Sequence, residues 1–389
     1  MNRMEHLVNQ HVREIQVSGI RKFSMRVAAY EDAISLTLGQ PDFPTPEHIK
    51  EAAKRAIEQN QTVYTLNAGL LDLRRAACQF VATRYGQHYD PATEVIVTNG
   101  ASQAIDVTLR TILEPGVEVI LPGPVYPGYE PIVKQCGAIP VYVDTRETGF
   151  KLTAEGIRAK LTDKTRAVLL PYPSNPTGVV LERADLAAIA DLLRDREIFV
   201  MSDEIYSELV YGEQGHHSIA NEPGMRVKTI VINGLSKSHS MTGWRIGFTL
   251  APAEISQHLI KVHQYSVSCA SSISQFAALE ALTNGVDDAL PMRAEYLKRR
   301  DYVYDRLLAM GLACEKPEGA FYLFPSVQEF GLPSFEFCLR MLETEKLAVV
   351  PGDAFSDYGE GYIRLSYAYS MEALQEALDR MERFVQSLR

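Results

Sequence analysis

The sequence predicts an α/β fold, in which a mainly parallel sheet is covered by helices on both faces, together with a smaller α+β part. Two observations predict it. Seven short apolar runs alternate with amphipathic stretches through the middle of the chain, and from about residue 291 a long charged helix pattern and shorter strands replace this alternation. Apolar strands that alternate with helices indicate parallel strands buried on both sides. The chain has 389 residues, 46% of them hydrophobic, which is enough for a large core and two domains.

The expected strands of the large sheet are short and apolar. They are residues 94–99, 118–123, 139–144, 166–173, 198–204, 228–234 and 245–251. Between several of them the apolar residues recur with helical spacing, as in residues 102–113 and 182–196. We expect these helices to cover the sheet.

The C-terminal part has the pattern of an α+β module. Its elements are a helix, three short strands and a last helix, at residues 292–310, 319–325, 348–352, 362–368 and 371–388. We expect the first 45 residues to pack with this module. The predicted division is therefore a large domain of residues 46–290 and a small domain formed by residues 1–45 and 291–389.

The formal net charge of -10 argues against a general nucleic-acid binder and against a protein that binds anionic membranes. We therefore expect neither nucleic acid nor a membrane among the partners. An acidic chain can still contain a local cationic pocket.

Cysteine usage favours a reducing, cytoplasmic location. The cysteines are scattered and odd in number: Cys78, Cys136, Cys269, Cys314 and Cys338. Their spacing does not resemble a zinc site or a disulfide framework, so we expect no metal. The first 16 residues lack the apolar core of a signal peptide. No run of about 18 apolar residues occurs, so we expect no transmembrane helix.

Unusual polar residues stand where the predicted strands end. Residues 100–102, a glycine followed by two small residues, join one strand to a helix, and Asn175 follows another strand. Asp203 ends a third strand, and Lys237 closely follows a fourth. Ligands of open α/β sheets bind outside the carboxyl ends of the strands. One ligand could therefore touch all of these residues.

The chemistry of these residues suggests what that ligand is. A helix that begins with small residues offers free N–H groups to a phosphate, and Arg245 can add a forked contact to it. Lys237 can form a Schiff base with an aldehyde. Asp203 can keep an aromatic nitrogen protonated, while Tyr206 and Asn175 suit a ring hydroxyl. A phosphate, an aldehyde, a protonated ring nitrogen and a ring hydroxyl together describe pyridoxal 5'-phosphate.

Each residue also has an ordinary structural interpretation. A lysine among small residues is more often a solvated surface lysine, and an aspartate after a strand is often a helix cap. The stretch "SNPTG" is also a turn signal, and an arginine in "IRLSYA" is usually a surface charge on an edge strand. The ordered set, with each member at a strand end, favours the ligand site over these alternatives.

The chain resembles the fold-type I pyridoxal-phosphate-dependent aminotransferases of class I and II across nearly its whole length. The matching motifs, in order, are "LGQPDFPTP", "YTLNAGLLDLR", "TNGASQA", "PYPSNPTG", "SDEIYSEL", "NGLSKSHSMTGWRIGF" and "IRLSYA". The resemblance implies the family's fold, with a mainly parallel seven-stranded sheet in the large domain. It also implies a homodimer with shared active sites.

The resemblance also implies roles for individual residues. Lys237 binds the cofactor's aldehyde, Asp203 pairs with its ring nitrogen, and Tyr206 contacts its 3'-oxygen; these three are the expected catalytic residues. The expected phosphate contacts come from Ala101, Ser102, Ser236, Arg245 and the neighbouring subunit's Tyr64. Tyr126 is expected to stack on the ring, and Asn175 to contact the 3'-oxygen. Arg364, Gly39 and Asn175 are expected to bind the substrate α-carboxylate. Some family members carry serine three residues before the lysine, where this chain has Gly234. That phosphate contact is expected from Ser236 instead.

The implied reaction moves the amino group of an L-amino acid to a 2-oxo acid, expected to be 2-oxoglutarate, by a ping-pong mechanism. Stretches partly outside the shared motifs resemble the branch of the family that acts on N-acetyl-LL-2,6-diaminopimelate in lysine biosynthesis: residues 18–23, 122–132, 170–179, 261–275 and 301–312. An aromatic or aspartate aminotransferase is an alternative, and so is a carbon–sulfur β-lyase, because the cofactor supplies the same carbanion to each.

Two alternatives come from other classes of protein. A transcription regulator on this scaffold needs an added DNA-binding module, for which the first 45 residues are too few. A cofactor-free binding protein has no need for Lys237 in combination with Asp203. We therefore expect an enzyme.

Overall fold

The computed structural model describes residues 4–389, and the first three residues of the predicted small-domain segment lie outside the described residues. The largest sheet has seven strands in the order β2-β8-β7-β6-β5-β3-β4. Their bounds are β2 Val95–Thr98, β3 Glu118–Gly123, β4 Ile139–Asp144, β5 Thr165–Leu170, β6 Phe199–Asp203, β7 Thr229–Gly234 and β8 Gly247–Leu250. Each strand overlaps one of the seven apolar runs, so this prediction is confirmed.

Strand β8 runs antiparallel to both of its neighbours, β2 and β7, whereas the remaining pairs of the sheet are parallel. Because β8 lies between β2 and β7, these two run in the same direction. The carboxyl ends of β2, β5, β6 and β7 therefore lie at one edge of the sheet, and β8 begins at that same edge.

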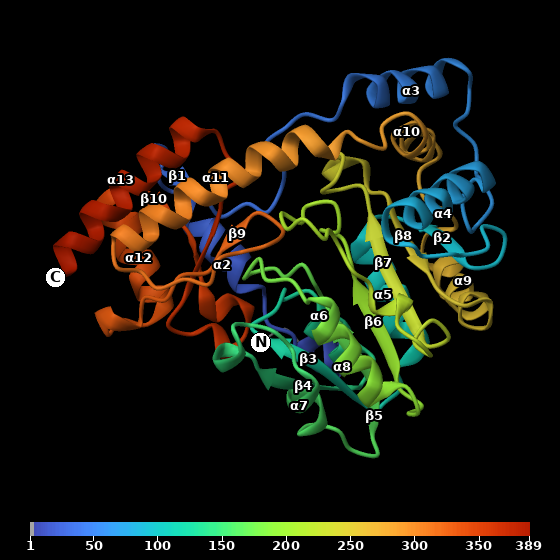
Figure 1. Ribbon diagram of the computed structural model, residues 1–389, viewed down its shortest axis with the longest axis horizontal. Helices are drawn as coiled ribbons and strands as arrows, with labels where there is room; N and C mark the ends of the chain where they lie inside the picture. Colours follow the sequence, from blue (N-terminus) through green and yellow to red (C-terminus); the bar gives the residue numbers. More distant parts are fainter. Residues whose placement is uncertain (1–3) are drawn as a thin grey trace.

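Helices cover both faces of this sheet (Figure 1). Their bounds are α3 Glu47–Glu58, α4 Leu71–Tyr85, α5 Ala101–Ile112, α6 Tyr129–Gln135, α7 Ala154–Arg158, α8 Arg183–Leu193, α9 Ala253–Val267 and α10 Ser272–Thr283. Alternate strand residues enter different apolar clusters. Val119 and Leu121 pack with α5, α6 and α9, whereas Ile120 between them packs with α7 and α8. Side chains of a strand alternate between its faces, so burial of both faces explains why these strands are apolar throughout.

The second part of the structure joins the two ends of the chain. Strand β1 Ile34–Ser35 pairs in parallel with β10 Leu347–Ala348, and β11 Val350–Pro351, β12 Ile363–Ser366 and β9 Tyr322–Leu323 form a three-stranded antiparallel sheet. The helices here are α1 Gln10–Arg13, α2 Gly19–Val27, α11 Ala289–Ala309, α12 Ser334–Glu345 and α13 Met371–Leu388. Phe23 and Leu36 share one apolar core with Tyr296, Phe337 and Leu378. The predicted packing of the first segment against the C-terminal module is thus present, while the domain bounds themselves stay a prediction.

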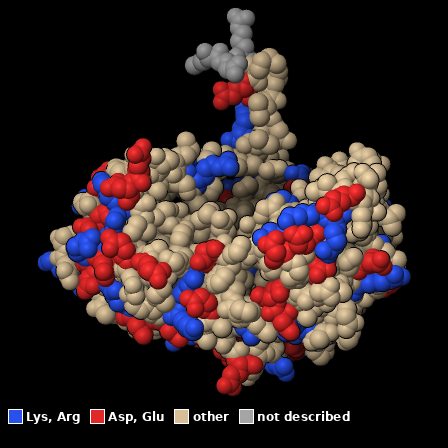
Figure 2. All heavy atoms as spheres, turned by 90° about the horizontal axis from the view of Figure 1, so that it is seen from above, with Lys and Arg blue, Asp and Glu red and all other residues tan. Residues whose placement is uncertain are grey.

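Short 3-10 helices complete the chain at Glu5–Leu7, Arg146–Thr148, Ile219–Asn221, Thr242–Trp244, Gln328–Phe330, Gly352–Phe355 and Asp357–Gly359. Residues 4–14 are exposed, the segment that begins at residue 4 projects from the body of the molecule in Figure 2, and α1 contacts α6. Charges of both signs are interspersed on the face that Figure 2 shows. Within residues 4–389, no helix has the length and hydropathy needed to cross a membrane.

Candidate active site

The strand ends, the start of β8 and the small three-stranded sheet enclose a cavity of about 370 Å³. All of the predicted site residues except Tyr64 line it: Gly39, Ala101, Ser102, Tyr126, Asn175, Asp203, Tyr206, Ser236, Lys237, Arg245 and Arg364. Tyr64 is 86% exposed and lies outside this cavity. Its predicted contact is with a neighbouring subunit.

The charged side chains of the described residues that line the cavity are Asp203, Lys237, Arg245 and Arg364. When all four are ionised, cations outnumber the carboxylate three to one. Buried cations are costly unless they have partners. The cavity therefore suits a ligand, or a pair of ligands, with more than one anionic group.

Lys237 follows the end of β7, and its Nζ donates a 2.6 Å hydrogen bond to the carbonyl oxygen of Gly39. Burial, followed by the nearby charges of Arg364 and Arg245, lowers the pKa of Lys237 to about 8. A substantial fraction of neutral amine is therefore present near neutral pH. A neutral amine can attack an aldehyde or accept a proton.

Asp203 is the last residue of β6 and is 6% exposed. Burial raises its pKa to about 6, although a 2.7 Å hydrogen bond from the phenol of Tyr129 opposes the shift. The backbone N–H of Ile205 also donates to this carboxylate, over 3.2 Å. A cationic N–H partner would stabilise the ionised form of Asp203, so this carboxylate is positioned to accept a hydrogen bond from such a group.

Tyr129 is a residue of the site that was not predicted from the sequence. It stands three residues after Tyr126, at the start of α6, and lines the same cavity. Tyr126 itself precedes the helix, and the two rings pack edge to face with their centres 5.5 Å apart. A second tyrosine so close to Tyr126 in the sequence was the available signal. Its phenol is buried, and burial raises the pKa of Tyr129 well above its ordinary value, so it remains protonated and can donate to Asp203.

Arg245 lies against the start of α5, whose first N–H groups have no partner within the helix. A Cβ on Gly100, the residue that caps this helix, would lie 2.4 Å from Nη2 of Arg245. Arg245 itself has a φ of 55°, a left-handed conformation that is rare outside glycine. This strained arginine and the helix start together form a cradle of donors typical of phosphate sites.

The glycine that departs from the family pattern has a steric explanation. A Cβ on Gly234 would lie 2.9 Å from the carbonyl oxygen of Ile246 and 3.1 Å from Cα of Gly247. A serine does not fit there without a shift of the backbone. Ser236 is buried and lines the cavity, so a hydroxyl is still available.

Arg364, on β12, is 2% exposed and is held by two hydrogen bonds. Its Nη1 donates to Oδ1 of Asn175 over 2.9 Å, and its Nη2 donates to the carbonyl oxygen of Thr37 over 2.6 Å. The buried Nε has no hydrogen-bond partner anywhere in residues 4–389. A guanidinium with donors to spare fits a carboxylate ligand.

These donors fit pyridoxal 5'-phosphate. The cradle at Arg245 suits the phosphate, the lysine amine suits the aldehyde, and the carboxylate of Asp203 suits a protonated ring nitrogen. The cofactor would not use the unpartnered Nε of Arg364. This donor provides a second anion site, which suits the carboxylate of an amino acid. Among the described residues, no group of three or more His, Cys, Asp and Glu side chains is placed to hold a metal ion.

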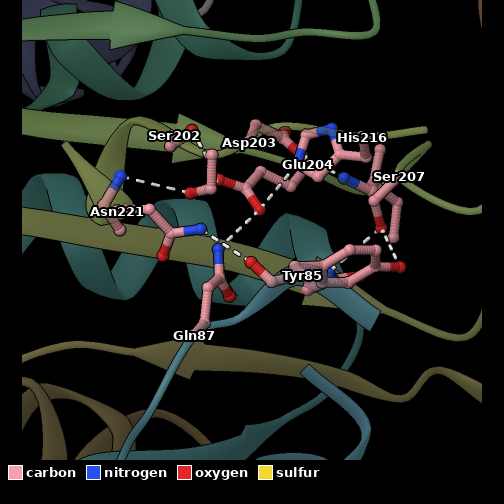
Figure 3. Close-up of polar contacts among 12 residues, drawn as sticks. Tyr85, Gln87, Ser202, Asp203, Glu204, Ser207, His216 and Asn221 are labelled. Atoms are coloured by element: carbon pink, nitrogen blue, oxygen red, sulfur yellow. Dashed lines mark hydrogen bonds and ion pairs between the residues drawn. The ribbon is translucent and has the colours of Figure 1, made fainter. Parts of the chain in front are cut away.

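A buried polar network lies behind Asp203 on the same strand. Glu204 is 0% exposed and accepts hydrogen bonds from Gln87, Ser202 and Ser218, while Nε2 of His216 lies 2.9 Å from its Oε2. Figure 3 shows Gln87 and His216 turned toward this carboxylate. The joint burial of Glu204 and His216 was not predicted from the sequence, because nothing in their local sequence distinguishes them from surface residues.

Comparison with known proteins identifies the family. Residues 31–381 match the sequence model described as "Aminotransferase class I and II". The chain is 62% identical to a Bacillus subtilis protein named "Probable N-acetyl-LL-diaminopimelate aminotransferase", over 98% of this chain and 96% of that protein.

Solved structures agree with this match. A Pyrococcus protein called protein-A1 superposes with a TM-score of 0.95 at 43% identity, covering 97% of this chain and 98% of that one. The aromatic aminotransferase from Pyrococcus horikoshii superposes with a TM-score of 0.89 at 43% identity, covering 94% and 99%. The chain therefore belongs to the aminotransferase class I and II family, whose enzymes depend on pyridoxal 5'-phosphate.

Proposed function

We propose that this aminotransferase transfers the amino group of N-acetyl-LL-2,6-diaminopimelate to a 2-oxo acid, with 2-oxoglutarate as the acceptor, in lysine biosynthesis. The identity of 62% to the Bacillus subtilis protein of that name supports the substrate. The observation that carries the reaction is the cavity in which Lys237, Asp203 and Arg364 meet.

The roles of the residues follow from the chemistry of their surroundings. Arg245, Ser236 and the N–H groups of Ala101 and Ser102 bind the cofactor phosphate. Tyr126 packs on the ring, and Tyr206 and Asn175 donate to its 3'-oxygen. Asp203 accepts a hydrogen bond from the ring N–H, and Tyr129 holds this carboxylate in place.

Arg364, with Asn175 and Gly39, binds the α-carboxylate of the amino acid and orients its Cα–H bond toward Lys237. When bound, the cofactor accepts the electron pair that remains after the Cα proton leaves. Nζ of Lys237 takes that proton, and its lowered pKa of about 8 keeps the amine available as a base near neutral pH. The apolar walls of the cavity limit water during this step.

We also propose a homodimer in which Tyr64 of one subunit binds the cofactor phosphate of the other. Its exposure supports this, as does the exposure of the neighbouring Val63 and Leu66, at 71% and 66%. Apolar side chains that are exposed together mark a surface that binds another protein. The cytoplasmic location and the domain bounds predicted from the sequence stay predictions.

A panel of amino donors tests the substrate. The purified enzyme would be assayed with 2-oxoglutarate and, in separate reactions, N-acetyl-LL-2,6-diaminopimelate, unacetylated diaminopimelate, aspartate, phenylalanine and cystathionine. We expect the acetylated donor to give the highest kcat/KM, with one glutamate formed for each donor consumed. A higher value for aspartate or phenylalanine would overturn the substrate but not the reaction. Release of a thiol and ammonia from cystathionine without 2-oxoglutarate would instead identify a β-lyase.

A further inference from the structure

Tyr322 contacts both halves of the site, through Arg364 on one side and Tyr206 on the other. It lies on β9, is 1% exposed and lines the cavity. Its neighbour in the sheet is β12, which carries Arg364, through the pair Tyr322 and Ser366. It therefore belongs to the small sheet but reaches the residues at the ends of the large one.

The ring of Tyr322 supports Arg364. The guanidinium carbon of Arg364 lies 4.5 Å from the centre of the Tyr322 ring and 4.9 Å from the centre of the Phe355 ring. Aromatic faces attract a guanidinium and restrict its plane. This contact uses the ring of Tyr322 and does not need its hydroxyl.

The hydroxyl of Tyr322 supports Tyr206 instead. The two phenol oxygens are 2.8 Å apart, and either can be the donor. Burial raises the pKa of both phenols, that of Tyr206 well above its ordinary value, so each keeps its single proton. If Tyr206 is to donate to a ligand, the shared hydrogen bond must be donated by Tyr322.

The position of this hydroxyl is closely defined. A Cβ on Gly39 would lie 2.2 Å from the Tyr322 oxygen, so the space on that side is open only because residue 39 is glycine. The carbonyl oxygen of Gly39 also accepts the hydrogen bond from Lys237. The hydroxyl is thus enclosed between Gly39 and Tyr206.

We propose that Tyr322 is a positioning residue that fixes Arg364 and Tyr206 relative to each other, through its ring and its hydroxyl respectively. The inference rests on the proposed function, in which Arg364 binds the substrate carboxylate and Tyr206 donates to the 3'-oxygen of the cofactor. A donor to the oxygen of Tyr206 polarises its O–H bond and makes Tyr206 the stronger donor. One side chain would then couple the substrate end of the site to the cofactor end.

The two parts can be separated by substitution. Tyr322→Phe removes the hydroxyl and keeps the ring over Arg364, whereas Tyr322→Leu removes both. Tyr206→Phe and the double variant Tyr206→Phe/Tyr322→Phe show whether the hydroxyl acts through Tyr206. Tyr367→Phe is the matched control, because Tyr367 is a fully buried phenol in the same core that bonds to Tyr211 and Ala320 and does not line the cavity.

The first measurement is the pH midpoint at which the visible absorbance of the bound cofactor changes. A donor to the 3'-oxygen favours its ionised form, so losing the donor raises the midpoint. We expect Tyr322→Phe to raise it by about 0.3 pH unit, in the direction of Tyr206→Phe but by less. The charged groups that face the cofactor, Asp203, Lys237, Arg245 and Arg364, are unchanged in these variants.

The second measurement is steady-state kinetics. Tyr322→Phe should lower kcat while leaving KM for the amino acid within about twofold, and Tyr322→Leu should raise that KM by about 3- to 30-fold. The double variant should have the midpoint of Tyr206→Phe alone. Tyr367→Phe should change neither quantity.

An unchanged midpoint in Tyr322→Phe would overturn the proposal, and so would a double variant whose shift is the sum of the two single shifts. Equal changes in Tyr367→Phe would also overturn it, because they would show a general loosening of the core. The proposed function fails in a different way, since wild-type enzyme loaded with cofactor would then transfer no amino group from any donor.

Discussion

The phenol of Tyr129 donates a 2.7 Å hydrogen bond to Oδ2 of Asp203, at the point where β6 ends in the cavity. This bond only partly offsets burial, because the pKa of Asp203 is still raised to about 6. In an unfolded chain the pKa of an aspartate is about 3.9. In the cofactor-free protein, the ionised form of this carboxylate is therefore destabilised by its burial.

Asp203→Asn should stabilise the cofactor-free protein while weakening its function. Since the folded pKa lies above the unfolded one, ionised Asp203 lowers the free energy of unfolding above about pH 6, and this cost disappears below about pH 4. We expect the variant to gain about 3 kcal/mol at pH 7.5 and clearly less at pH 4.5, measured by urea unfolding. It should also bind cofactor less tightly, because an amide does not pair with a protonated ring nitrogen.

Asp144→Asn is the control for this experiment. The hydrogen bond from Arg146 lowers the pKa of Asp144, so this variant should lose stability at neutral pH instead of gaining it. Equal stability of Asp203→Asn and wild type at both pH values would show that burial does not destabilise ionised Asp203.

Lys237 should be the most reactive lysine of the cofactor-free protein near neutral pH. Its pKa of about 8 leaves roughly a hundredfold more neutral amine than an ordinary lysine has. Trace labelling with acetic anhydride, followed by peptide mapping, should therefore mark Lys237 before the exposed Lys54, whose pKa is raised by its bond to Glu51. Arg364→Met should raise the labelling midpoint of Lys237, because Arg364 is one of the charges that lower its pKa.

Cofactor should protect Lys237 from this label, and borohydride should then fix the cofactor to the same residue. Lys237→Ala should still bind cofactor but lose nearly all turnover, because the base is gone. Fixation at another lysine, or near-normal turnover in Lys237→Ala, would refute the assignment.

Arg245→Lys and Arg364→Lys should fail in different ways. A lysine does not reproduce the forked contact of an arginine. Each change should therefore weaken binding of the anion that the arginine contacts, by about tenfold to several hundredfold. That anion is the cofactor phosphate for Arg245 and the substrate carboxylate for Arg364. Arg245→Lys should release cofactor more readily and recover activity when cofactor is added. Arg364→Lys should keep its cofactor but need far more amino acid and oxo acid. Identical or exchanged defects in absorbance and kinetics would mean that phosphate and carboxylate are assigned to the wrong ends.

Hybrid dimers should reveal whether active sites are shared. If Tyr64 serves the neighbouring subunit, a dimer of one Tyr64→Ala chain and one Lys237→Ala chain has one intact site and one site with both defects. Random mixing of the two weakened variants should then restore about one quarter of wild-type activity. Each variant refolded alone by the same procedure is the control, and a mixture no more active than these would place Tyr64 outside the site.

Glu204→Ala should destabilise the fold without touching the cavity. The change leaves the buried donors of Gln87, Ser202 and Ser218 without their acceptor, so we expect a loss of about 2–4 kcal/mol in urea unfolding. Glu213→Ala, an exposed carboxylate in the same loop region, should change stability by less than about 0.5 kcal/mol. Equal losses in the two variants would show that the network of Figure 3 contributes nothing specific.

The sequence was informative about the large sheet because both faces of its strands are buried. Runs such as residues 118–123 stay apolar without interruption, and their ends are marked by small and polar residues. Part of the cavity lining could be predicted for the same reason, since Asp203 ends one such run and Lys237 closely follows another. The short strands of the second part were less well defined. Of the predicted residues 319–325, only Tyr322–Leu323 form a strand, because the antiparallel pairing with β12 is brief.

Contacts between distant segments were beyond the reach of the sequence. Tyr322 is one aromatic residue among several in "GAFYLFP", and only the folded chain brings its hydroxyl next to Tyr206. Glu204 is likewise adjacent to Asp203 in sequence, but its partners Gln87 and Ser218 come from elsewhere. Such partners are set by the tertiary fold, for which local patterns carry no signal.

The pairing of β1 with β10 has a consequence for the order in which the protein can be completed during synthesis. The strands of the seven-stranded sheet are all contained within residues 95–250, so the ribosome has released them well before the chain is finished. Thr37, whose carbonyl oxygen accepts a hydrogen bond from Arg364, emerges near the start of translation. This hydrogen bond can form only after residue 364 has been synthesised. The half of the site that we propose binds the amino acid is thus the last part of the enzyme to be built.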